Sequence, residues 1–192
     1  MNNRILRLAG LFGILTPPIG FGLVALSISL APWFSWANNA LSDLGAKGFE
    51  SVIFNSGLPM TGAVMMMFST GLFEMSKKNL IGTIGSVLYL LASFFLIGIG
   101  VANINIRPWH FYVSVAFFVT LPICLIVLGI FHFLNNMKMY ATIAWFMAFL
   151  AAVIWAFPWK GVAIPEALSA AFVSVWQVSL AIWMYNREIN EK

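Results

Sequence analysis

The chain has 192 residues, of which 61% are hydrophobic and 8% are charged, and its mean hydropathy is +0.94. Soluble domains carry about 25% charged residues, so this composition excludes an ordinary soluble domain. The formal net charge is +4, from ten basic and six acidic residues. A single cysteine, Cys124, excludes an internal disulfide and a cluster of thiolate metal ligands.

Six apolar runs follow one another along the chain, separated by short segments rich in proline, glycine, asparagine or charge. Each run is about as long as a helix that crosses a bilayer, which takes roughly 20 apolar residues. The runs cover about residues 5–30, 51–73, 80–103, 108–134, 139–157 and 162–185. The sequence therefore predicts an all-α protein, with residues 1–192 forming a single domain of six transmembrane helices.

Two features inside these runs predict special helix contacts. Pro17 and Pro18 lie near the middle of the first run, where they remove two backbone N–H donors. We expect a packed kink there, with a broken helix that lines a transport path as the alternative. Gln177 is an isolated amide in the last run, and we expect it to form a hydrogen bond between helices.

Basic residues are distributed unequally between the two ends of the predicted bundle. With a cytoplasmic N-terminus, that side carries Arg4, Arg7, Lys77, Lys78, Lys138, Arg187 and Lys192, and the other side carries Lys47, Arg107 and Lys160. Basic loops stay in the cytoplasm, so we expect a multi-pass plasma-membrane protein with both termini inside. The positive charge acts as an insertion signal and attracts anionic lipid, and it does not indicate nucleic-acid binding.

The longest polar stretch, NNALSDLGAKGFE at residues 38–50, becomes the first external loop in this topology. The second, fourth and sixth helices begin at the same face, and helix starts present unpaired N–H groups and the positive end of the helix dipole. The predicted ligand-binding residues at this face are Asn39, Ser42, Asp43, Asn55, Arg107, His110 and Glu166. Helix starts and the arginine favour an anionic head group.

A purely structural role is the alternative for these residues. Asn38 or Asn39 is suited to cap a short interfacial helix, ALSDLG, that Gly45 would end in a left-handed turn. Asp43 and Glu166 would then satisfy helix-end N–H groups, and the arginine would pair with one of them. The histidine would be a hydrogen-bonded residue at a helix interface.

Asp43, His110 and Glu166 are also candidates for a catalytic acid and base, because ionisable residues near membrane depth are functional candidates. An enzyme would need these three side chains within hydrogen-bond reach of one another around a cavity. Ser42 with Asp43 and His110 supplies the residue types of an acyl-transfer site, although adjacent residues rarely serve one imidazole in that way. His132 is 22 residues from His110, about 33 Å along a helix, so no shared metal and no cofactor is expected.

Three stretches carry a family resemblance: NNALSDLGA, FNSGLPMTG at residues 54–62 and RPWHFYVSVAFF at residues 107–118. They resemble the prokaryotic six-helix family catalogued as domain-of-unknown-function family 998. The matching positions are Ser42, Asp43, Leu44, Gly45, Asn55, Gly57, Pro108 and His110. The resemblance covers nearly the whole chain in its order of helices, and it implies the topology without implying an activity. A fainter likeness of architecture reaches eukaryotic six-helix proteins of the autophagy-modulator and lipid-remodelling kind.

The leading functional hypothesis is that the protein binds or organises a lipid or another membrane component at its extracytoplasmic face. One alternative is a membrane-embedded hydrolase or transferase that acts on a lipid-like substrate, and another is a small transporter or channel subunit. The expected partners are membrane lipids, with a membrane-protein partner or a homo-oligomer as a further option.

Overall fold

The computed structural model describes residues 1–187, and this part of the chain is helical apart from its turns and loops. The six long helices are α1 (Asn3–Ser29), α2 (Gly48–Ser76), α3 (Leu80–Val101), α4 (Trp109–Leu134), α5 (Lys138–Val153) and α6 (Ala163–Tyr185). Two short 3-10 helices are η1 (Leu41–Gly45) and η2 (Ile154–Ala156). All six long helices, α5 together with η2, are long and apolar enough to cross a membrane, which confirms the predicted fold class. Lys192, counted above among the cytoplasmic basic residues, lies outside the described residues.

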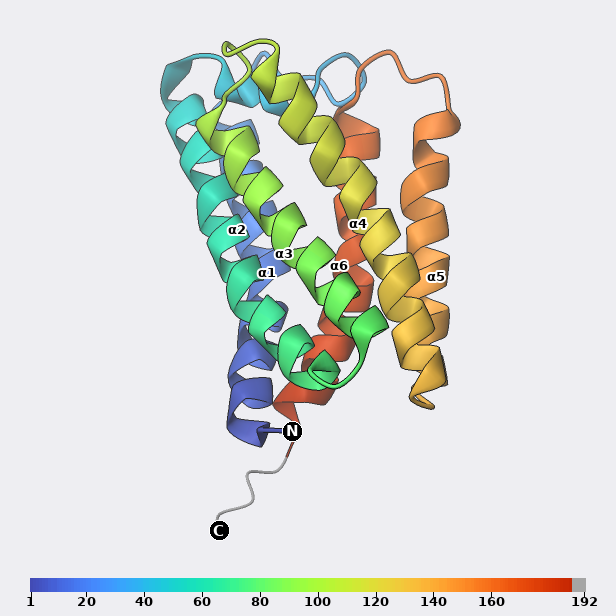
Figure 1. Cartoon of the computed structure of the whole chain (residues 1–192). Helices are drawn as coiled ribbons and strands as arrows, with labels where there is room; N and C mark the ends of the chain where they lie inside the picture. Colours follow the sequence, from blue (N-terminus) through green and yellow to red (C-terminus); the bar gives the residue numbers. More distant parts are fainter. Residues whose placement is uncertain (188–192) are drawn as a thin grey trace.

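The helices form a closed bundle in which neighbours in sequence are neighbours in space (Figure 1). Each helix packs against the next one along the chain, and α6 closes the bundle by packing against α1. One end, called the loop end below, carries the connecting segments 30–47, 102–108 and 157–162. The opposite end, called the terminal end, carries the start of α1 and the end of α6.

The interior is densely packed between the middle of the bundle and the terminal end. The rings of Phe68, Tyr89 and Trp176 lie 5.4–6.4 Å apart between centroids, in edge-to-face and tilted arrangements that aromatic pairs prefer. Leu125 and Leu128 of α4 are fully buried beside them. This packing closes the interior on the terminal side, whereas the loop end contains the open space described below.

The prolines of α1 explain the contacts of Gln177. Pro17 has no N–H, so the carbonyl of Gly13, four residues earlier, lacks its helical donor. The side-chain amide of Gln177 donates to this carbonyl at 3.0 Å, and its oxygen accepts a hydrogen bond from the hydroxyl of Tyr89. The predicted interhelical hydrogen bond is confirmed. A broken helix is wrong, because α1 is helical through Pro17 and Pro18 once the freed carbonyl has a new donor.

Candidate functional site

The loops at the loop end are fastened to one another, so that the first loop lies across the start of α6. The backbone of this loop pairs with the segment that precedes α6, and the segment between α3 and α4 reaches the same loop. The hydrogen bonds run from Gly161 N to Ala37 O, from Ala163 N to Asn39 O and from Asn105 Nδ2 to Ala46 O, each 2.9 Å long. Three segments distant in sequence therefore form one cover over the end of the bundle.

Asp43 caps the start of η1. Its carboxylate accepts hydrogen bonds from the backbone N–H of Ala40 at 2.9 Å and from the side-chain amide of Asn39 at 3.0 Å. The cap residue of η1 is Ala40, so the predicted cap by Asn38 or Asn39 is wrong. The physical reason is that Asp43 reaches back from inside the helix to satisfy the cap, while the amide oxygen of Asn39 accepts from the backbone N–H of Ser35 at 2.9 Å.

Gly45 and Asn55 hold η1 against α2. The predicted left-handed turn at Gly45 is wrong, because the positive φ of this region, 76°, belongs to Gly48. Glycine at position 45 is required by space, since a Cβ there would lie 2.5 Å from Oδ1 of Asn55. The amide nitrogen of Asn55 donates to the Gly45 carbonyl at 3.0 Å. Asn55 is therefore placed as a clamp between the first loop and α2.

His110 joins the start of α4 to the end of α3. Its side chain is only 6% exposed, and its Nδ1 lies 2.8 Å from the carbonyl oxygen of Ala102. A carbonyl only accepts, so Nδ1 carries the proton in this contact. Nε2 lies 3.5 Å from the hydroxyl of Ser114, one turn further along α4. The imidazole thus has two partners, and neither is a predicted catalytic residue.

Arg107 stands apart from the acidic residues. Its side chain is exposed, and within the described part of the chain it forms no ion pair, so the predicted pairing with Asp43 or Glu166 is wrong. Its place in an exposed connection between α3 and α4 accounts for this separation. The three candidate acid–base residues also have separate partners, since Glu166 accepts from the backbone of Leu41 and contacts neither Asp43 nor His110 by a hydrogen bond.

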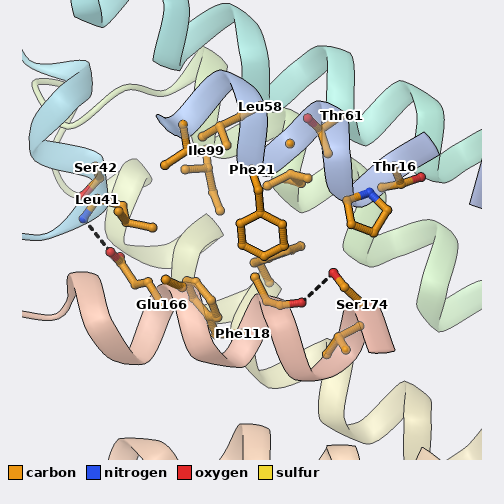
Figure 2. A pocket seen from close by; sticks show the side chains of 18 of the residues that line it. Thr16, Phe21, Leu41, Ser42, Leu58, Thr61, Ile99, Phe118, Glu166 and Ser174 are labelled. Atoms are coloured by element: carbon orange, nitrogen blue, oxygen red, sulfur yellow. Dashed lines mark hydrogen bonds between the residues drawn. The ribbon is translucent and has the colours of Figure 1, made fainter. Parts of the chain in front are cut away.

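An apolar cavity of about 340 Å³ lies inside the loop-end half of the bundle, lined by residues of α1, α2, α3, α4 and α6 (Figure 2). Figure 2 shows the ring of Phe21 in the space between α1 and α6, with Leu58 and Ile99 on the side of the first loop. Ser42 and Glu166 form the part of its wall next to the first loop, and Thr16 lies towards the middle of the bundle. Gln177 also lines the cavity. Glu166 is the one ionisable residue among the described residues that line this space.

A second cavity of about 640 Å³ adjoins the first one as a groove between α4, α5 and α6. Its α4 wall includes Phe111 and Val119, which are 63% and 52% exposed on the membrane-spanning surface of the bundle. The two cavities share Ser114, Phe118 and Glu166 as lining residues. The interior cavity therefore borders a groove that opens sideways, and Glu166 lies where the two meet.

The structure divides the predicted site residues into two groups. Ser42 and Glu166 line the interior cavity, whereas Asn39, Asp43, Asn55, Arg107 and His110 are absent from its wall. Ser114 and the apolar wall were not among the predicted site residues. Ser114 follows His110 by four residues, so the two share a helix face, and this spacing is the one signal that points to it. The apolar wall carries no signal of its own.

Comparison with known proteins finds a match to one family model over most of the chain. The model of the family described as "Protein of unknown function (DUF998)" matches residues 14–183, from within α1 to near the end of α6. The matched segment includes both cavities and all three connections at the loop end. No curated protein and no solved structure matches the chain.

Proposed function

We propose that this protein, which belongs to the DUF998 family, holds one apolar chain of a membrane lipid in the interior cavity at its loop end. The observation that carries this proposal is the cavity itself. Its volume of about 340 Å³ lies in the range of about 300–1,000 Å³ that is typical of small-molecule sites. Its walls are almost entirely apolar, and an alkyl chain gains the most from such surroundings because water there finds few hydrogen-bond partners.

The adjoining groove supplies a route for the lipid. Its α4 wall is exposed on the surface that crosses the membrane, where lipid chains are the surrounding solvent. A lipid chain would pass between α4 and the α5–α6 pair, past Phe118, and reach the interior cavity without entering water. The polar end of the lipid would stay near Glu166 and the first loop.

The loop end faces away from the cytoplasm in this proposal, with both termini inside a plasma membrane. The basic residues support this orientation, because cytoplasmic segments retain lysine and arginine. In the described part of the chain, Arg4, Arg7, Lys77, Lys78, Lys138 and Arg187 belong to the terminal end, and Lys47, Arg107 and Lys160 belong to the loop end. The lipid would therefore come from the outer leaflet.

No contact among the described residues favours the enzyme alternative over binding. General acid–base catalysis needs its groups within hydrogen-bond reach of one substrate position. Of the three candidates, Glu166 alone lines the interior cavity, and Asp43 and His110 are engaged in the loops. Binding without turnover is the simplest use of this arrangement.

The test is native mass spectrometry of the protein extracted gently from its own membranes. Ala170 lines the cavity on α6, so Ala170→Phe fills the space, whereas Ala63→Phe adds the same bulk to an exposed position of α2 that lines neither cavity. We expect a lipid mass on the wild type and on Ala63→Phe, and its loss from Ala170→Phe. Wild-type protein without lipid, or equal retention by folded Ala170→Phe, would overturn the proposal.

A further inference from the structure

We infer that the lipid held at this site carries a positively charged amine head group, which pairs with the carboxylate of Glu166. The inference rests on the proposed function and names the chemical class of its ligand. Glu166 is half-buried in the first turn of α6 and lies on the wall of both cavities. Its carboxylate is the recognition group.

The hydrogen bonds of Glu166 leave one of its oxygens free for a ligand. Oε2 accepts from the backbone N–H of Leu41 at 2.7 Å, and Oε1 has no hydrogen bond to any described residue. No described lysine, arginine or histidine lies within ion-pair distance of this carboxylate. A carboxylate beside apolar walls is costly without a partner, so a cation supplied by the ligand offsets that cost.

The surrounding charges oppose an anionic head group inside the cavity. Lys47, Arg107 and Lys160, the basic residues of the loop end, are all exposed, and none of them lines either cavity. Asp43, which caps η1 in the first loop, adds a second negative charge to that of Glu166. A phosphate or carboxylate placed beside Glu166 would meet like charge without a compensating cation. The preference is therefore the reverse of the anionic head group expected from the helix starts and Arg107.

The neutral polar residues near Glu166 complete the match to an ammonium group. Ser42 lines the interior cavity on the side of the first loop, and Ser114 lines both cavities on α4 (Figure 2 shows Ser42 and Glu166 at the same end of the cavity). An ammonium group has three N–H donors and no acceptor. One carboxylate oxygen and two hydroxyl oxygens offer it three acceptors on the wall, and the apolar remainder of the cavity suits one alkyl tail.

The test compares amphiphiles that share one tail and differ in their heads. Delipidated protein in detergent is titrated with dodecylamine, dodecanol and dodecanoic acid, and bound ligand is counted by native mass spectrometry. We expect the amine to bind about tenfold more tightly than the alcohol, as one charge-assisted hydrogen bond implies, and the acid to bind most weakly. Equal or tighter binding of the acid to the wild type would overturn the inference, and this comparison needs no variant.

Glu166→Gln is the matched variant, because its amide oxygen can still accept from Leu41 while the charge is lost. We expect it to erase the preference for the amine and to keep dodecanol binding. A preference that survives in Glu166→Gln would contradict the inference and leave the lipid proposal intact. Two other results would instead contradict the lipid proposal itself. One is failure of all three amphiphiles to bind the wild type, and the other is binding of all three to Ala170→Phe as tightly as to the wild type.

One further ligand distinguishes the sources of an amine. Lysophosphatidylethanolamine carries its ammonium beside a phosphate, whereas dodecylamine carries the ammonium alone. If both bind more tightly to the wild type than to Glu166→Gln, the ligand is a phospholipid with an amine head. If only dodecylamine shows this difference, the ligand is a free long-chain amine. Either result supports the inference, and a lack of difference for both contradicts it.

Discussion

The backbone N–H of Leu41 donates a hydrogen bond of 2.7 Å to the carboxylate of Glu166, which lies 125 residues further along the chain. This contact fixes η1 to the start of α6, and it also sets the orientation of the carboxylate on the wall of the cavity. The same side chain is therefore part of the loop architecture and the candidate recognition group. Its two roles are separable by substitution, because one depends on a hydrogen-bond acceptor and the other on charge.

Glu166→Ala removes the acceptor for the partly buried N–H of Leu41. An unpaired donor of this kind costs about 1–3 kcal/mol of the free energy of unfolding. We expect a loss in this range for Glu166→Ala and a smaller one for Glu166→Gln, which keeps an acceptor. Equilibrium unfolding in detergent measures the loss, and hydrogen exchange of residues 38–46 should rise in the alanine variant only. Equal exchange in the two variants would show that this contact does not hold the first loop.

Gln177→Leu tests the repair of α1 at Pro17. The substitution leaves the Gly13 carbonyl without its donor and the Tyr89 hydroxyl without its acceptor. We expect a loss of about 1–3 kcal/mol in the free energy of unfolding. In a Pro17→Ala background the residue at position 17 again donates to Gly13, so the same substitution should cost less. Additive costs in this double-mutant cycle would contradict the coupling.

His110→Ala tests whether the imidazole is structural. The substitution removes the contact with the Ala102 carbonyl, and we expect the free energy of unfolding to fall by about 1 kcal/mol. Hydrogen exchange around residues 102–110 should rise, while native mass spectrometry should show the same retained lipid as in the wild type. Loss of the lipid with unchanged exchange would make His110 a ligand-binding residue.

The fold could be predicted closely because hydrophobic length is a strong signal in a membrane protein. Three helix boundaries agree with the ends of the apolar runs: α3 begins at Leu80, α4 ends at Leu134 and α6 ends at Tyr185. α2 is longer than its run, because polar residues at both ends continue the helix beyond the apolar stretch. α5 is shorter, ending at Val153, because its last turn tightens into η2.

The candidate site could be predicted only in part. Ser42 and Glu166 line the cavity, and a polar residue in an apolar chain is easy to find. Phe21 and Ala170 were missed, because an apolar residue that lines a cavity has the same sequence pattern as one that faces lipid. The predicted ion pair of Arg107 with Asp43 or Glu166 is wrong, since sequence proximity to a helix start does not show where a long side chain points. The cavity exists only in the packed bundle, so no local pattern encodes it.

Phe21→Ala tests whether the Phe21 ring limits the length of the bound chain. The ring lies in the cavity between α1 and α6, and its removal extends the apolar space (Figure 2). We expect the chain length that binds most tightly in an amphiphile series to increase by several carbons. Native mass spectrometry of the wild type and the variant with the same amine series measures this shift. An unchanged optimum would show that another residue sets the length.

The proposed orientation is tested with single cysteines in a Cys124→Ser background. Lys160 at the loop end and Lys78 at the terminal end are both exposed, so either accepts a cysteine with little structural effect. We expect a membrane-impermeant maleimide to label Lys160→Cys in intact cells and Lys78→Cys only after permeabilisation. The reverse pattern would place the loop end in the cytoplasm and the lipid in the inner leaflet.

Photo-crosslinking from inside the cavity addresses the lipid directly. Leu58 lines the interior cavity, whereas Leu91 is an exposed residue of α3 that lines neither cavity. An alkyl diazirine side chain at position 58 therefore samples the cavity, and one at position 91 samples the surrounding bilayer. We predict that the side chain at position 58 captures one dominant lipid species and that the one at position 91 captures the bulk lipid mixture. Identical mixtures at both positions, or no lipid adduct at position 58, would contradict a lipid-binding cavity.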